Sequence, residues 1–128
     1  MRVNHIGLVN NSKEAARTFY HTILGLDEKY SFTLKEDETR QIFGMATACD
    51  VLVFEKDGVK IEVFVPGKKV ELNLGMSHFC LDVKDLPEVL QRCEAKGAEI
   101  IRLKRGERVV HFVKDFCENI IELKEEMH

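Results

Sequence analysis

Hydrophobic and polar residues follow one pattern along this chain, and the pattern occurs twice. The first copy opens on a short run of β-forming residues, VNHIGLVN (3–10), which predicts a strand. Apolar residues at helical spacing follow, and Gly25 supplies a left-handed stop after them. Asn11 is placed to cap this helix, with Glu14 closing a capping box. The apolar stripe of the predicted helix consists of Ala15, Ala16, Phe19, Tyr20, Ile23 and Leu24.

Three strand-like segments complete the first copy, after a polar stretch from Lys35 to Arg40 that we expect to be a solvated loop. Asp57-Gly58 joins the last two of these segments, and this dipeptide is typical of a tight hairpin turn. The predicted strands are Gln41–Ala48, Val51–Lys56 and Val59–Val65.

The second copy repeats this order. Ser77–Val83 is the predicted first strand, and Asp85 caps a helix with Pro87 in its first turn and Glu88 closing a capping box. Gly97 is again placed to end the helix. The remaining predicted strands are Ala98–Leu103, Arg108–Lys114 and Ile120–Lys124.

An internal repeat of this size constrains the fold strongly. It predicts an α+β protein of two tandem βαβββ modules that form an open, curved mixed sheet with the helices on its outer face. Module one covers 1–66, a linker covers 67–75 and module two covers 76–128, so the whole chain, 1–128, makes one domain.

Two histidines and two glutamates occupy equivalent places in the two modules. A histidine stands early in the first strand of each, and a glutamate stands in the last strand of each. Side chains alternate faces along a strand, so each of the four is predicted to lie opposite the apolar face that meets the helix. Two imidazoles and two carboxylates suit one divalent ion such as Zn, Ni, Co, Mn or Fe. The predicted ligands are His5, Glu62, His78 and Glu122; taken singly, each would more often be a polar residue on the solvent side of a sheet.

Three further side chains are candidates for a substrate pocket. Phe64 is predicted to share a face with Glu62, and Cys80 to share one with His78, although simple packing explains both equally well. His111 has an ambiguous facing in its strand, where a structural or surface role is the alternative.

Composition narrows the classes of partner that the protein is expected to bind and the compartment in which it is expected to act. Nineteen basic and 22 acidic residues give a formal charge of -3, with no basic block, so nothing favours nucleic acid. No apolar run approaches the roughly 20 residues that span a bilayer, so no membrane association is expected. The four cysteines are widely spaced and no signal peptide is evident, which predicts reduced thiols in a cytoplasmic protein.

The chain resembles the vicinal oxygen chelate superfamily, which includes glyoxalase I, methylmalonyl-CoA epimerase, fosfomycin-resistance proteins and extradiol dioxygenases. This resemblance implies paired βαβββ modules, a homodimer, a small-molecule substrate and metal ligands from matching strands, here His5, Glu62, His78 and Glu122. The ligand set is most similar to those of glyoxalase I and the epimerase. The motifs that carry the resemblance are Asn4-His5-Ile6-Gly7, Phe19-Tyr20, Leu24-Gly25-Leu26, Lys60-Ile61-Glu62, His78–Val83 and Asn119–Leu123.

The resemblance implies a metal-dependent lyase or isomerase of glyoxalase-I-like type. Its metal stabilises an enediolate or enolate, and Glu122 or Glu62 is the base. Glutathione-using relatives carry an Arg where this chain has Val9, and an Asn where it has Val65 and Pro66, so glutathione is not implied. The alternatives are a non-catalytic binding or resistance protein such as those that bind bleomycin, and a metal-dependent enzyme that opens an epoxide antibiotic of the fosfomycin type.

Overall fold

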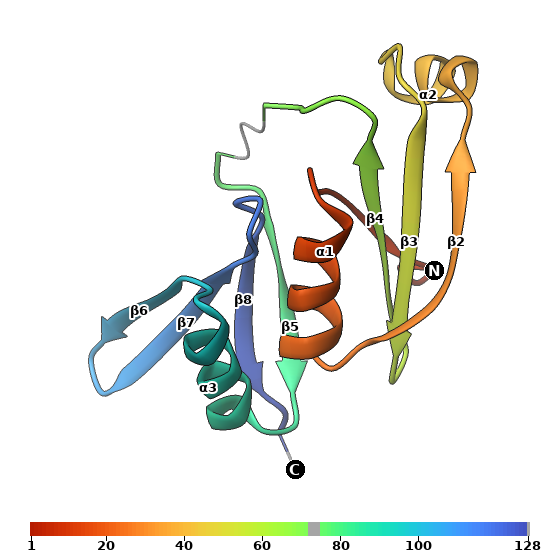
Figure 1. The fold of residues 1–128 in the computed structure, drawn as a ribbon. Coiled ribbons are helices and arrows are strands. Elements are labelled where there is room, and N and C mark those ends of the chain that lie inside the picture. The colour runs from red at the N-terminus through yellow and green to blue at the C-terminus, as the bar shows by residue number, and fades with distance from the viewer. Residues whose placement is uncertain (72–74, 128) are drawn as a thin grey trace. The chain divides into compact units, whose positions relative to one another are not determined.

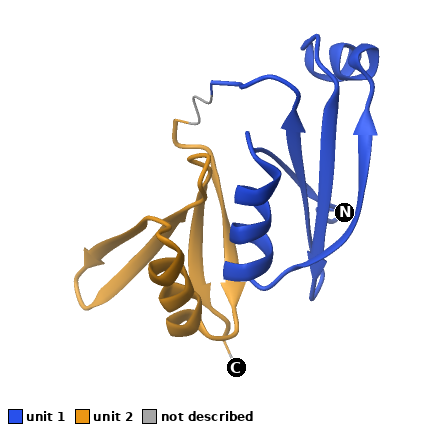
Figure 2. Ribbon diagram, viewed as in Figure 1, with its two compact units in different colours: residues 1–71 blue, residues 72–128 orange. Residues whose placement is uncertain are grey.

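The computed structural model describes residues 1–71 and 75–127, which fall into two compact units (Figures 1 and 2). The first unit is Met1–Glu71 and the second is Leu72–His128. Each holds one four-stranded sheet and the same order of a strand, a helix and three strands. The predicted α+β class and the repeated βαβββ order are therefore confirmed. The predicted linker, 67–75, lies partly outside the described residues.

The first unit carries an additional short helix between its second and third strands. Its sheet has the order β1-β4-β3-β2, with β1 parallel to β4 and the other neighbours antiparallel. The elements of this unit are β1 (Ile6–Val9), α1 (Lys13–Ala16), η1 (Arg17–Ile23), β2 (Asp27–Leu34), α2 (Glu36–Phe43), β3 (Cys49–Lys56) and β4 (Val59–Pro66).

The second unit has a sheet of order β5-β8-β7-β6, with β5 parallel to β8 and the other neighbours antiparallel. Two of its predicted helix signals are confirmed, because Asp85 accepts a hydrogen bond from the Glu88 amide and Gly97 ends the helix at a φ of 77°. The Glu88 carboxylate, predicted to close a capping box, instead accepts a hydrogen bond from Arg92 at 3.0 Å. Its elements are β5 (His78–Val83), α3 (Leu86–Lys96), β6 (Ile100–Arg105), β7 (Arg108–Lys114) and β8 (Ile120–Glu125). No helix of the two described ranges is long and apolar enough to cross a membrane.

The cap of the first helix differs from the prediction. Ser12, not Asn11, is the N-cap, and its hydroxyl accepts a hydrogen bond from the Ala15 amide at 3.1 Å. The Asn11 side chain instead binds the backbone of Val70, donating to its carbonyl at 3.3 Å and accepting from its amide at 3.1 Å. Asn11 therefore joins the start of the helix to the segment that follows β4, a long-range contact that local sequence spacing does not reveal.

The first helix widens after one turn. α1 continues as the π-helical stretch η1, in which the Leu24 amide donates to the Phe19 carbonyl, five residues earlier, at 3.0 Å. Phe19 and Tyr20 are adjacent in sequence, and both are fully buried. The Tyr20 ring lies 5.9 Å from that of Phe54 in β3, so this helix packs on one face of the sheet. Gly25 follows with a φ of 80°, as the stop signal predicts.

The second strand of the first unit lies elsewhere than predicted. β2 occupies Asp27–Leu34, whereas the predicted strand Gln41–Ala48 begins inside α2. β2 is an edge strand with nearly all its side chains exposed, and it begins with the charged residues Asp27–Lys29. Tyr30, Phe32 and Leu34 alternate with polar residues in its second half, a strand signal that the prediction missed. The predicted loop at Lys35 is the start of α2, where the Glu38 carboxylate accepts a hydrogen bond from the Lys35 amide at 2.9 Å.

The alternation of side chains gives each sheet a face that meets the helix and an opposite face, here called the polar face after the glutamate on it, although in the first sheet it also carries the buried Val51 and Val53. In the first unit, Ile61 and Val63 are fully buried on the face that carries Phe54 and meets the helix, and Glu62 lies on the other face. In the second unit, Ile121 and Leu123 are buried and Glu122 lies opposite them. The predicted facing of both glutamates is therefore confirmed.

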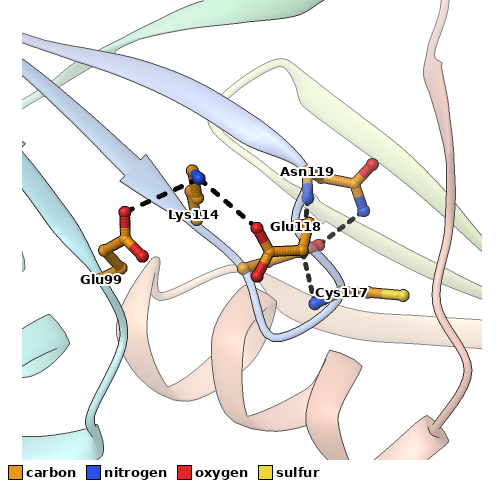
Figure 3. Close-up of polar contacts among 6 residues, drawn as sticks. Glu99, Lys114, Cys117, Glu118 and Asn119 are labelled. Atoms are coloured by element: carbon orange, nitrogen blue, oxygen red, sulfur yellow. Dashed lines mark hydrogen bonds and ion pairs between the residues drawn. The ribbon is translucent and has the colours of Figure 1, made fainter. Parts of the chain in front are cut away.

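A buried carboxylate holds the turn that precedes β8 (Figure 3). Asp115 Oδ1 accepts hydrogen bonds from the backbone amides of Cys117 and Asn119, both at 2.9 Å, and Oδ2 accepts from Asn119 Nδ2 at 2.8 Å. The turn places Glu118 at a φ of 68°, a left-handed conformation that usually favours glycine. Lys114 Nζ lies 3.4 Å from the Glu118 carboxylate and 3.7 Å from that of Glu99.

We expect Asp115→Ala to lower the free energy of unfolding by about 3 kcal/mol, because it leaves several buried donors without an acceptor. Asp82→Ala, which removes an exposed carboxylate from the same unit, should change it by less than about 0.5 kcal/mol. Urea unfolding followed by circular dichroism measures both. Equal effects of the two substitutions would contradict the anchoring role of Asp115.

Candidate metal centre

His5 and Glu62 meet on the polar face of the first unit. His5 directly precedes β1, and its Nε2 lies 3.4 Å from Oε1 of Glu62 in β4. The Nδ1 atom of His5 lies 3.0 Å from Asn4 Oδ1. Since an amide oxygen only accepts hydrogen bonds, this contact corresponds to the tautomer with its proton on Nδ1, and the other ring nitrogen faces the carboxylate.

This arrangement fits a cation. A neutral imidazole with its proton on Nδ1 directs the lone pair of Nε2 toward a negative carboxylate oxygen, which is unfavourable unless a positive charge compensates it. A second proton on the ring or a metal ion bound by both groups supplies that charge. Asn4 thereby holds the orientation of the His5 ring, as the outer partners of metal-binding histidines do.

The second unit repeats the histidine geometry. His78 begins β5, and its Nδ1 donates to the backbone carbonyl of Met76 at 2.8 Å, which leaves Nε2 free to bind a metal. The His78 ring lies edge-on to that of Phe112, with centroids 5.7 Å apart. Phe112 pairs with Glu122 in the register of β7 and β8, so His78 and Glu122 share the polar face of their sheet.

Glu122 has a different charged neighbour from Glu62. Its side chain is 17% exposed, and its carboxylate lies 3.8 Å from Nζ of Lys124, which is largely exposed. In the part of the chain that the structure describes, no ion pair joins His78 to Glu122. The register nevertheless makes the two units equivalent: Gly7 pairs with Glu62, Cys80 pairs with Glu122, and each histidine stands two residues before that partner.

Two of the three predicted pocket residues share the polar face with a glutamate. Phe64 is half-buried and lies two residues after Glu62 in β4. Its ring lies edge-on to that of Phe43 in α2, with the ring centroids 5.3 Å apart. Phe64 also lies over Gly7, where an added Cβ would be 3.2 Å from its ring. Cys80 is exposed beside Glu122, and burial together with the negative charge of Glu122 raises the pKa of its thiol.

His111 lies on the other face. It pairs with Leu123 of β8, a buried residue on the helix side of the sheet, so the structure does not bring it to the face of Glu122. Burial, with a smaller contribution from Arg102, lowers the pKa of its imidazole. This placement supports the structural role that the sequence left open.

Each unit contributes a pair of ligand-type groups. Within either unit, the described residues contain no group of three or more His, Cys, Asp or Glu side chains that could hold a metal. The outer partners of the two histidines, Asn4 and the Met76 carbonyl, were missed from the sequence. Asn4 stands directly before His5 in the sequence, so its role could have been proposed from the sequence. The Met76 carbonyl could not, because every residue has a backbone carbonyl.

The chain belongs to the glyoxalase/bleomycin resistance protein/dioxygenase superfamily, whose family model matches residues 4–112. That match includes His5, Glu62 and His78 and ends before Glu122. No curated protein matches the chain closely enough to indicate a particular activity.

Solved structures share the fold over nearly the whole chain. A glyoxalase family protein from Bacillus cereus is 15% identical, with a TM-score of 0.77 over 100% of this chain and 95% of that one. The fosfomycin resistance protein FosX from Listeria monocytogenes is 17% identical, with a TM-score of 0.73 and coverage of 99% and 94%. A mutant of FosX complexed with Mn(II) and 1S,2S-dihydroxypropylphosphonic acid is 19% identical, with a TM-score of 0.74 and coverage of 98% and 93%.

The pairing of Cys80 with Glu122 makes a measurable prediction. Glu122→Gln removes a negative charge beside the thiol, so it should lower the Cys80 pKa and speed alkylation by iodoacetamide at mildly alkaline pH about threefold. Mass spectrometry of the peptide that contains Cys80 follows the rate. Glu118→Gln removes the same charge from the distant turn and should leave the rate unchanged; equal acceleration by both would contradict the placement.

Proposed function

We propose that His5, Glu62, His78 and Glu122 together bind one divalent metal ion, and that the protein is a metal-dependent lyase or isomerase of glyoxalase-like type. The contact of His5 Nε2 with the Glu62 carboxylate, with Nδ1 held by Asn4, carries this proposal. The repeat of a histidine with an anchored Nδ1, on the same face as a glutamate, supports it in the second unit. Zn, Ni, Co, Mn and Fe all suit a set of two imidazoles and two carboxylates.

The proposed reaction uses the metal as a Lewis acid and one of the two glutamates as a base. A divalent metal, when bound, supplies Lewis acidity to the oxygen atoms of a substrate. Glu122 or Glu62 accepts a proton from the carbon next to those oxygens and returns it to a neighbouring atom. Glu62 is 13% exposed at its side chain and Glu122 is 17% exposed, so each carboxylate is shielded from bulk water yet reachable by a small molecule. Phe64 and Cys80 are proposed to line the substrate pocket.

We also infer a homodimer in the cytoplasm. The superfamily supports the dimer. The spacing of the four cysteines, all of which are free thiols in the structure, supports a reducing compartment.

Metal binding tests the four ligands directly. After chelation and dialysis, the protein should regain about one ion per chain, because three or four ligands of this type are enough for a protein metal site. His5→Ala and His78→Ala should each weaken binding at least tenfold, on the scale that losing part of a ligand shell produces. Titration calorimetry with each of the five metals measures the affinity.

His111→Gln is the matched control, since it removes a histidine from the opposite face of the second sheet. It should leave metal affinity unchanged. A protein that binds none of the five metals, or that loses as much affinity in His111→Gln as in His78→Ala, would exclude the proposed site.

Turnover tests the reaction class. Hemithioacetals, acyl-CoA esters and fosfomycin represent the lyase, epimerase and epoxide-opening reactions, and we expect turnover of a substrate of the first two kinds. Glu122→Gln or Glu62→Gln should lower kcat by about a hundredfold or more in the variant that has lost the base, because general base catalysis contributes that much.

The same panel separates the alternatives. Fosfomycin turnover without proton abstraction would assign the epoxide-opening reaction. Tight binding of a panel molecule by the metal-loaded protein, without turnover of any, would show a sequestering protein and overturn the enzyme proposal. The metal content of each glutamine variant, measured in parallel, distinguishes loss of the base from loss of the metal.

A further inference from the structure

The β6–β7 hairpin is a basic element of an acidic chain. Ile100–Lys114 contains five basic side chains and one acidic one, whereas the whole chain carries a formal charge of -3. Arg105 and Arg108 are paired across the hairpin at its tip, and with Gly106 they line an open hollow of about 430 Å³. Neither arginine takes part in an ion pair with a described residue, in contrast to Arg102, which lies 3.1 Å from the Glu94 carboxylate.

Two exposed apolar side chains share a strand face with Arg105. Ile101 and Leu103 are 39% and 50% exposed and stand at alternate positions of β6 with Arg105. Val109, which is 47% exposed, pairs with Lys104 and lies on the opposite face of the hairpin. An exposed apolar group bordered by charges is typical of a surface that binds another protein.

The helix α2 is acidic, in contrast to the basic β6–β7 hairpin, and it also exposes apolar side chains. Its first turn holds three consecutive carboxylates, Glu36, Asp37 and Glu38, and its end exposes Ile42 and Phe43, at 62% and 51%. Asp37 has no ion pair with any residue of the described ranges, and Glu36 pairs only with Arg40 of the same helix, at 3.0 Å.

We propose that the arginine-lined tip of the β6–β7 hairpin of one chain binds α2 of a second copy of this chain. Charge complementarity selects this partner: the free arginines face carboxylates, and Ile101 and Leu103, on the same strand face as Arg105, face Ile42 and Phe43. One copy carries both surfaces, so a twofold arrangement makes the same contact twice and closes the dimer. The inference rests on the homodimer proposed above and does not depend on the metal.

Reciprocal charge reversal tests the contact. Variant one carries Arg105→Glu and Arg108→Glu; variant two carries Glu36→Lys and Asp37→Lys and keeps Glu38, which accepts the Lys35 amide. In a homodimer of either variant, like charges would meet at both contacts. Each variant on its own should therefore have the mass of one chain. An equimolar mixture restores opposite charges at both contacts of the heterodimer and should regain the mass of two chains.

Controls with the same charge changes lie elsewhere on exposed surface. Lys68→Glu with Lys69→Glu matches variant one, and Glu14→Lys with Glu71→Lys matches variant two. Both should remain dimers in sedimentation equilibrium at micromolar concentration, as should the unmodified protein. Because exposed charges are screened by salt, rising ionic strength should weaken the dimer of the unmodified protein.

Several results would overturn the inference: a monomeric unmodified protein, dimers of either reversal variant alone, or a folded mixture that fails to pair. A rescue of thermal stability within one chain that carries all four reversals, with no change in mass, would place the contact inside the chain and would also overturn it. Circular dichroism checks that each variant is folded. Metal content is measured on the same samples, so a failure of this contact with the metal retained leaves the proposed metal site standing.

Discussion

The parallel pairing of the first and last strands in each unit is the constraint on which the candidate site depends. Gly7 pairs with Glu62 and Cys80 pairs with Glu122, and a slip of one residue would move each glutamate to the helix side of its sheet. Hydrogen bonds beyond the strands extend this register: the Asn10 amide donates to Phe64, and the Glu126 amide donates to Val83. β1 is only four residues long, so these additional bonds matter for holding it in place.

The sequence could predict the features that have a period or a local signal. The facing of Glu62 followed from its buried neighbours Ile61 and Val63, and the Asp57-Gly58 turn followed from a dipeptide whose residues adopt φ values of 53° and 83°. β2 was missed although Tyr30, Phe32 and Leu34 alternate with polar residues, because its first half is charged and nearly all its side chains are exposed.

The facing of the candidate ligands could be predicted, but their geometry could not. The spacing of the repeats singles out the four ligand-type groups, and their joint role stays a proposal that rests on the resemblance to a superfamily. The contact of His5 with Glu62 depends on a backbone path that brings 5 and 62 together, and the anchor of His78 is a carbonyl that any residue could supply. Such tertiary details have no counterpart in a local sequence pattern.

The charges around the two glutamates are compatible with the proposed cation. Among the described residues, the ion-pair partner of Glu62 is His5 and that of Glu122 is Lys124, an exposed ammonium whose ion pair at 3.8 Å contributes little to stability. Each unit thus holds one imidazole and one carboxylate, which are too few ligands for a tight metal site. If all four bind one ion, metal affinity depends on both units at once, and the free energy of binding adds to the stability of both. In the proposed site each module therefore supplies half of the ligands, and metal binding requires two modules to act together.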